Sequence, residues 1–144
     1  MCGICGILSD PENLGERECN VVEEMKARIL HRGPDGEGLH VSDFAVFGHR
    51  RLAIIDLEHG QQPMATSDGR FVLAFNGEIY NYLELRRELI AEGVQFRTES
   101  DTEVLLQLLV RERENALAKL NGMFAFVFLE VSTGEWLMAR DQFG

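Results

Sequence analysis

Two stretches of the sequence are almost continuously apolar: FVLAF at residues 71–75 and MFAFVFL at residues 123–129. Both have the length of a strand, and a strand without polar alternation needs cover on both of its faces. Two sheets packed on each other, with helices on their outer sides, provide that cover. Because several of the predicted strands are joined by short turns, the sheets should be mostly antiparallel. The sequence therefore predicts a layered α+β fold.

Apolar periodicity and turn residues divide the rest of the chain into further elements. A helix at 82–93 should end at Gly93, and a helix at 100–113 should begin with a capping box between Ser100 and Glu103. The other predicted elements are a strand at 3–8, a helix at 20–30, a turn at 31–38, two strands within 40–56 around Ser42 and Asp43, a strand at 70–81 and a hairpin at 121–141 that turns at 132–134. We find no repeat, linker or boundary, so residues 1–144 are predicted to form one domain.

The charge balance argues against two classes of partner. The chain has 24 acidic and 14 basic residues, a formal net charge of −10, and both nucleic acid and anionic membranes need a cationic surface. No apolar stretch approaches the roughly 20 residues of a membrane span, and the N-terminus lacks the features of a signal peptide. Three cysteines do not suit a disulfide scaffold. We therefore expect a cytoplasmic protein with reduced thiols.

The chain begins MCGICGIL, with Cys2 and Cys5 close together. A structural zinc site needs four nitrogen or sulfur ligands, and neither Cys19 nor the histidines are spaced to complete one. A redox CxxC motif usually opens a helix, but here a strand follows, in which residues 2 and 5 point to opposite faces. If Met1 is removed, Cys2 carries a thiol and a free α-amine that can take the thiol proton, as in an N-terminal nucleophile. These ten residues alone leave open whether Cys2 is that nucleophile or only begins a buried strand.

A resemblance to a known family extends over essentially the whole chain. It rests on the motifs MCGICGI, HRGPDGEG, GHRRLAIID, FNGEIYNYLELRREL, SDTEVLL, LNGMFAF and ARDQFG, which are specific in combination and weak singly. In this order they resemble the glutaminase domain of class II glutamine amidotransferases, and most of all the N-terminal domain of glutamine-hydrolysing asparagine synthetases. The resemblance implies the four-layer αββα sandwich of N-terminal nucleophile hydrolases. It also implies that Cys2 attacks the side-chain amide of L-glutamine, releasing ammonia and then, by hydrolysis of a thioester, glutamate.

Attack on an amide creates an oxyanion, which needs preorganised hydrogen-bond donors. The segment AFNGEIYN offers the side-chain amide of Asn76 and the backbone N–H of Gly77, and the resemblance implies that these two groups form the oxyanion hole. An Asn-Gly pair is also the strongest hairpin signal, so a tight turn is an alternative interpretation. The two are compatible, because a turn exposes an N–H group.

Recognition of free glutamine also requires partners for its α-carboxylate and α-ammonium groups. The resemblance implies that Arg51 binds the carboxylate, and Arg50 would then be a solvated charge. It places the backbone of Leu52, Ile54 and Ile55 beside the same pocket, and Asp101 with Glu78 near the ammonium. An acidic residue in the first turn of a helix, such as Asp101, is also favourable without any ligand. We do not expect His31 of the HRGPDG motif to be catalytic; Gly33, Pro34 and Gly36 should shape a turn near the site.

The family's glutaminase unit continues beyond ARDQFG into further strands and a synthetase domain, so the chain resembles a truncated piece of a longer protein. We expect no metal or cofactor in it, with ATP and magnesium bound only by the absent synthetase domain, because no Gly-rich phosphate loop is present. That domain is the expected protein partner, and uncovered strand edges would favour self-association. Two alternatives remain: a non-catalytic regulatory or docking module of the same fold, and the glutaminase domain of another amidotransferase.

Overall fold

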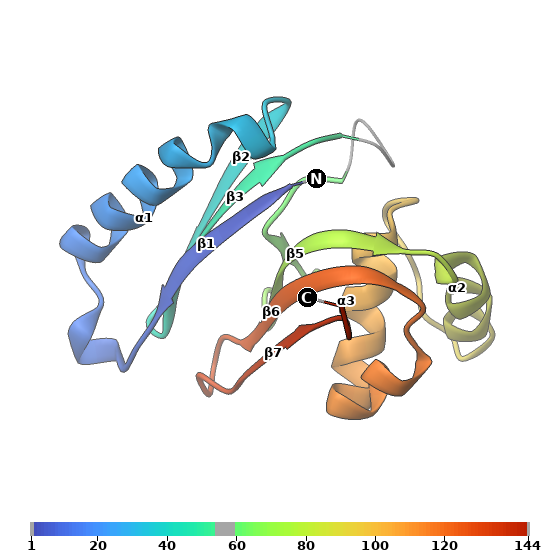
Figure 1. Ribbon diagram of the computed structural model, residues 1–144. Helices are drawn as coiled ribbons and strands as arrows, with labels where there is room; N and C mark the ends of the chain where they lie inside the picture. Colours follow the sequence, from blue (N-terminus) through green and yellow to red (C-terminus); the bar gives the residue numbers. More distant parts are fainter. Residues whose placement is uncertain (1, 54–59, 144) are drawn as a thin grey trace.

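The computed structural model describes residues 2–53 and 60–143, and these form four layers (Figure 1). The first layer is the helix α1 (Glu16–Arg28). The second is a three-stranded sheet in the order β1 (Gly3–Leu8), β3 (Ala45–Arg51), β2 (Gly36–Val41). The third is a four-stranded sheet in the order β4 (Met64–Ala65), β5 (Phe71–Ile79), β6 (Gly122–Glu130), β7 (Trp136–Arg140). The fourth consists of α2 (Tyr82–Ala91) and α3 (Asp101–Glu112).

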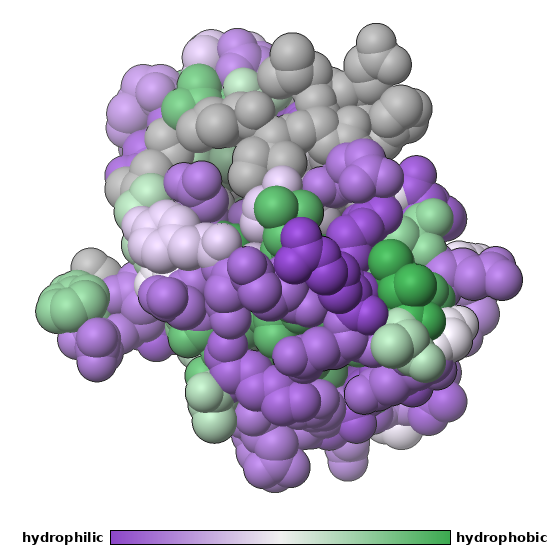
Figure 2. All heavy atoms as spheres, turned by 90° about the vertical axis from the view of Figure 1, so that its right-hand side faces the viewer, coloured by the Kyte–Doolittle hydropathy of each residue, from purple (hydrophilic) through white to green (hydrophobic). Residues whose placement is uncertain are grey.

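Both sheets are antiparallel throughout, so the predicted αββα arrangement is confirmed. The described residues also form the short 3₁₀ helices η1 (Pro11–Asn13), η2 (Leu30–Arg32) and η3 (Arg113–Lys119), which connect the layers. No helix in the described part of the chain is long and apolar enough to cross a membrane. The side of the molecule on which α2 lies is largely hydrophilic, with only scattered apolar side chains (Figure 2).

Residues 71–75 of β5 and 126–129 of β6 are buried on both faces, as their sequences predict, whereas Met123 at the start of the second apolar stretch is exposed. Alternate residues of β5 point in opposite directions, so Val72 and Ala74 join an apolar cluster between the sheets, whereas Leu73 and Phe75 join another beneath the outer helices. The first cluster also contains Ala45, Phe47, Val127 and Leu129, and the second also contains Leu105, Leu109, Phe126 and Phe128. This double burial explains why β5 and β6 lack polar alternation.

The predicted helix signals are largely confirmed. Gly93 has a φ of 91° and its N–H bonds to Ile90 O, ending α2 with a left-handed residue that glycine adopts without strain. Ser100 caps α3, because its Oγ accepts a hydrogen bond from Glu103 N at 3.2 Å. The reciprocal half of the capping box is replaced: the Glu103 carboxylate accepts instead from the backbone of Arg97 and Thr98.

The turn predicted at residues 31–38 is wrong over its last three residues. Gly36 and Gly38 lie in β2, paired with Arg51 and His49 of β3. A Cβ atom on Gly38 would lie 2.0 Å from the backbone oxygen of Gln62. Gly38 is therefore explained by the close approach of another chain segment, as glycines within strands often are.

Candidate active site

The nucleophile candidate Cys2 lies directly before β1, at the edge of the space between the two sheets. Because Gly3 pairs with Arg50 and side chains alternate, Cys2 shares the inner face of β1 with Ile4. Its Sγ accepts a hydrogen bond from Leu52 N at 3.3 Å and also lies 3.7 Å from Leu52 O, so the backbone of Leu52 holds the sulfur in place. Cys2 is half-buried, so it is held in place while remaining accessible.

Cys5 lies on the opposite face of β1, as the sequence predicts. Its Sγ lies 3.7 Å from Gly48 O and 3.9 Å from Val22 O, under α1. Burial raises the pKa of the Cys5 thiol, which disfavours its reactive thiolate. The two thiols therefore do not share a site, and all three cysteines of the chain are free.

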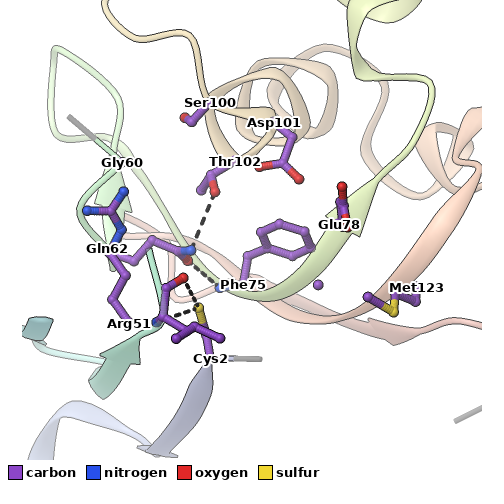
Figure 3. A pocket seen from close by; sticks show the side chains of 12 residues that line it. Cys2, Arg51, Gly60, Gln62, Phe75, Glu78, Ser100, Asp101, Thr102 and Met123 are labelled. Carbon is purple, nitrogen blue, oxygen red and sulfur yellow. Dashed lines mark hydrogen bonds between the residues drawn. The ribbon is translucent and has the colours of Figure 1, made fainter. Parts of the chain in front are cut away.

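A pocket opens beside Cys2 where the two sheets meet the start of α3 (Figure 3). It is lined by Cys2, Arg51, Leu52, Gly60, Gln62, Phe75, Gly77, Glu78, Ser100, Asp101, Thr102 and Met123. Six residues predicted from the sequence thus come together in one place, although they span a hundred positions of the chain. The predicted Ile54 and Ile55 fall outside the described residues.

The edge of β5 that faces this pocket carries a row of backbone groups. Phe75 N donates to Gln62 Oε1 at 2.7 Å, and Ile79 N donates to Asp101 Oδ2 at 3.0 Å. In an antiparallel strand, backbone groups two residues apart point to the same side. The N–H of Gly77, midway between these two, is therefore directed to the same edge, where a reacting oxygen could accept from it. A Cβ on Gly77 would lie 2.2 Å from Met123 O, so glycine is required here.

Asn76 lies within β5, paired with Ala125 of β6, and the alternative interpretation of a tight turn at Asn76–Gly77 is therefore wrong. Strand alternation directs its side chain to the space between the sheets, the same face as Ala74 and Glu78. Cys2 points into that space from the opposite sheet. Asn76 is not one of the residues that line the pocket, but its Oδ1 is buried without a hydrogen-bond partner in the described part of the chain.

Two carboxylates form one side of the pocket. Asp101, in the first turn of α3, and Glu78, from β5, point toward the same space (Figure 3). Burial raises the pKa of Asp101, and the nearby charge of Glu78 adds to this, while the hydrogen bond from Ile79 N opposes it. Asp101 is only 5% exposed, so a cation bound beside it would recover part of the lost solvation energy. This is the chemistry expected of an ammonium site.

The two neighbouring arginines point to different faces of β3, because side chains alternate along a strand. Arg51 lines the pocket on the side away from the two carboxylates (Figure 3). The expectation that Arg50 is a solvated charge is wrong. Its side chain is 15% exposed, pairs with Glu37 at 2.9 Å, and donates to Lys26 O of α1 at 3.2 Å.

The HRGPDG motif supports this part of β3, while His31 itself is exposed. Gly33 is buried, and a Cβ there would lie 2.4 Å from the carbonyl carbon of Arg50. Asp35 N donates to Arg51 O, and the Asp35 carboxylate accepts from Ala53 N. The motif thus braces the backbone on which Arg51 is carried.

Several pocket residues were not predicted from the sequence. Ser100 and Thr102 flank Asp101 in the SDTEVLL motif, so their helix-start pattern was a usable signal. No sequence signal marks the other three, Gln62, Phe75 and Met123. Gln62 lies between strands, and Phe75 and Met123 are ordinary apolar residues of apolar strands. Their position in the pocket follows only from tertiary packing.

The chain is similar to a known family of domains and to several curated proteins. A model of the glutamine amidotransferase domain family matches residues 1–144. The chain is 44% identical over 145 residues to glutamine-hydrolyzing asparagine synthetase 1 of Bacillus subtilis (strain 168), with all of this chain and 23% of that protein covered. It is 40% identical over 144 residues to glutamine-hydrolyzing asparagine synthetase 3 of Arabidopsis thaliana, again with all of this chain and 24% of that protein covered. The chain thus spans about a quarter of the length of these curated relatives.

Two solved structures share the fold. The allosteric regulatory enzyme of purine biosynthesis matches with a TM-score of 0.75 at 24% identity, over 96% of this chain and 37% of that one. Glutamine phosphoribosylpyrophosphate amidotransferase from B. subtilis matches with a TM-score of 0.67 at 23% identity, over 97% of this chain and 36% of that one.

Proposed function

Because this chain belongs to the glutamine amidotransferase domain family, we propose that it hydrolyses the side-chain amide of L-glutamine to glutamate and ammonia. It is homologous to the N-terminal portion of glutamine-hydrolyzing asparagine synthetases. The observation that carries the proposal is the convergence of the Cys2 thiol, the Gly77 edge of β5 and oppositely charged side chains on one pocket. Together they provide a nucleophile, an oxyanion donor and partners for an amino acid.

In the proposed mechanism, Met1 is first removed, so that Cys2 carries a free α-amine. The amine takes the thiol proton and Sγ attacks the amide carbon of glutamine, while Leu52 N–H stabilises the sulfur before attack. Gly77 N–H and the Asn76 side-chain amide hold the resulting oxyanion. When the tetrahedral intermediate collapses, the C–N bond of the substrate amide breaks. The protonated α-amine of Cys2 returns its proton to the leaving ammonia. Water then attacks the thioester, releasing glutamate and restoring the thiol.

The direct test is to incubate the chain with L-glutamine and quantify glutamate and ammonia, with intact mass measured on the same sample. We expect equal amounts of both products from a chain that lacks Met1. A chain that lacks Met1, binds glutamine and releases neither product would contradict the proposal and favour a non-catalytic module of the same fold.

Substrate binding gives a first quantitative prediction. Arg51→Ala and Asp101→Asn should each raise KM by roughly 10- to 100-fold with little change in kcat, because each removes a charge-assisted hydrogen bond worth about 1.5–3 kcal/mol. Asparagine at position 101 keeps an acceptor for Ile79 N, so β5 stays attached to α3. Steady-state kinetics provides the measurement. The control is Arg111→Ala, which breaks a surface ion pair with Glu92; a fall in kcat alone in either site variant would contradict these roles.

The raised pKa of Asp101 predicts how binding depends on pH. Its carboxylate must be charged to pair with the substrate ammonium, and burial makes it take up a proton at a higher pH than an ordinary aspartate. KM should therefore rise as the pH is lowered from about 7 to about 4. The measurement is KM across that range. In Asp101→Asn this acid-side rise should be much weaker, and an unchanged rise would assign it to another group.

The fate of the ammonia is part of the proposal. The relatives' names support asparagine synthesis by a synthetase portion outside this chain, to which ATP and magnesium would bind. A cytoplasmic location fits the three free thiols. In this view the chain supplies ammonia and recognises L-glutamine alone.

A further inference from the structure

The edge of β5 next to the oxyanion residues is held by side chains instead of a neighbouring strand. Within the described chain, β4 pairs with β5 only at Val72 and Leu73. Phe75 is two residues further along the same edge, and both of its backbone polar groups are engaged: Phe75 N donates to Gln62 Oε1 at 2.7 Å, and Phe75 O lies 3.1 Å from His49 Nε2. Asn76 and Gly77 come immediately after this point.

We propose that His49 and Gln62 are positioning residues for glutamine hydrolysis, which fix the backbone of Phe75 and thereby place the Asn76–Gly77 oxyanion donors against Cys2. The inference rests on the proposed function and deepens it. Neither side chain needs to touch the reacting atoms. They act on the part of β5 that is not hydrogen-bonded to β4.

His49 links the two halves of the site. It lies in β3, opposite Ile4 of β1 and two residues before Arg51, and it is fully buried between the sheets. Its Nε2 reaches across to Phe75 in the other sheet, so it ties the sheet of the nucleophile to the sheet of the oxyanion donors. Burial lowers the pKa of His49 to about 4, so the ring is neutral near pH 7 and donates its single proton to the Phe75 carbonyl.

Gln62 connects the same point of β5 to α3. Its side chain is buried, and while Oε1 accepts from Phe75 N, Nε2 donates to Thr102 Oγ1 at 3.4 Å (Figure 3). Thr102 is next to Asp101, the proposed ammonium partner. Gln62 thus sets the spacing between the oxyanion edge and the substrate-binding end of the pocket. If the buried amide lost either partner, a polar group would be left without a hydrogen bond, which costs free energy. The two hydrogen bonds therefore fix the position of the Gln62 side chain.

The test compares variants that remove or keep each hydrogen bond. His49→Leu and Gln62→Leu should lower kcat by roughly 10- to 100-fold, because small misplacements of catalytic groups cost about that much. In His49→Leu, KM should change by less than about twofold, whereas Gln62→Leu should also raise KM because Gln62 contacts Thr102 at the substrate-binding end. His49→Gln keeps a donor near the position of Nε2, and Gln62→Glu keeps an acceptor for Phe75 N. Both should recover most of kcat, and His49→Gln should keep the wild-type pH profile, because neutral His49 exchanges no proton with substrate.

His40→Leu is the matched control. His40 lies in β2, packs against Phe47, and its Nε2 has no hydrogen-bond partner among the residues that the structure describes. Its replacement removes a half-buried imidazole without removing a hydrogen bond, so kcat should stay at the wild-type level. The rate at which iodoacetamide alkylates Cys2 should also be unchanged in all of these variants, which shows that the nucleophile is intact.

The outcomes separate this inference from the proposed function. Wild-type hydrolysis with normal kcat in His49→Leu and Gln62→Leu would overturn the positioning role and leave the proposed function standing. A loss that the conservative variants do not recover, or one accompanied by slower alkylation of Cys2, would overturn it in favour of a purely structural role. A wild-type chain without Met1 that fails to hydrolyse glutamine would overturn both.

Discussion

Replacing Cys2 by alanine should abolish measurable glutamine hydrolysis, lowering kcat by roughly 10⁴-fold or more, as removal of a catalytic nucleophile generally does. Without the sulfur no thioester forms, and the α-amine has no proton to take. The substrate pocket is otherwise unchanged, so glutamine should still bind. Steady-state assay of glutamate release, together with calorimetric binding of glutamine to Cys2→Ala, measures both halves of this expectation.

The matched controls are the other two cysteines. Cys5 faces α1, away from the pocket, and burial raises the pKa of its thiol. Cys5→Ala and Cys19→Ala should therefore keep kcat within a few-fold of the wild type. If Cys5→Ala were as inactive as Cys2→Ala, with its fold intact by circular dichroism, the assignment of the nucleophile would be wrong.

The second large effect is expected at the oxyanion hole. Asn76→Ala should lower kcat by roughly 10²–10³-fold with little change in KM, because the lost amide acts on charge that develops only in the transition state. Its Oδ1 bonds to no other described residue, so we expect the fold to depend little on this side chain. Single-turnover kinetics of thioester formation would localise the effect to the chemical step.

Asn76→Asp sharpens this experiment, because aspartate has the same shape and lacks the N–H donor. It should be at least as slow as Asn76→Ala, since a carboxylate there would also repel the oxyanion. Asn115→Ala, at an exposed position of η3, serves as the control. A variant at position 76 with normal kcat and a raised KM would instead make Asn76 a substrate-binding residue.

The layers of the fold could be predicted because a strand whose sequence is continuously apolar must be buried on both faces. Residues 71–75 and 126–129 are apolar because one face of each strand packs on the other sheet and the opposite face packs on the outer helices. The two-residue strand β4 and the 3₁₀ helix η3 escaped prediction because such short elements carry no periodicity. Gly36 and Gly38 are residue types typical of turns, and nothing local in the sequence shows that both lie in β2 or that Gln62 approaches Gly38.

Some residues of the site could likewise be predicted from the sequence, and others could not. Cys2, Arg51, Gly77 and Asp101 belong to recognisable motifs, and the structure brings them to one pocket. Arg50 was misjudged, since its partner Glu37 belongs to another strand and the carbonyl that it binds belongs to α1. Gln62 and His49 were overlooked for the same reason: each matters through a hydrogen bond to Phe75, which no local pattern encodes.

The most direct test of the account is to identify which atom of the wild-type chain reacts with a glutamine-like diazoketone. After treatment, the N-terminal peptide is isolated and mapped by mass spectrometry. We expect a peptide that begins at Cys2, without Met1, and carries a single adduct on the Cys2 sulfur, with no adduct when excess L-glutamine is present. An adduct on Cys5, or a chain whose Cys2 reacts while Met1 is retained, would contradict the claim that Cys2 acts as an N-terminal nucleophile.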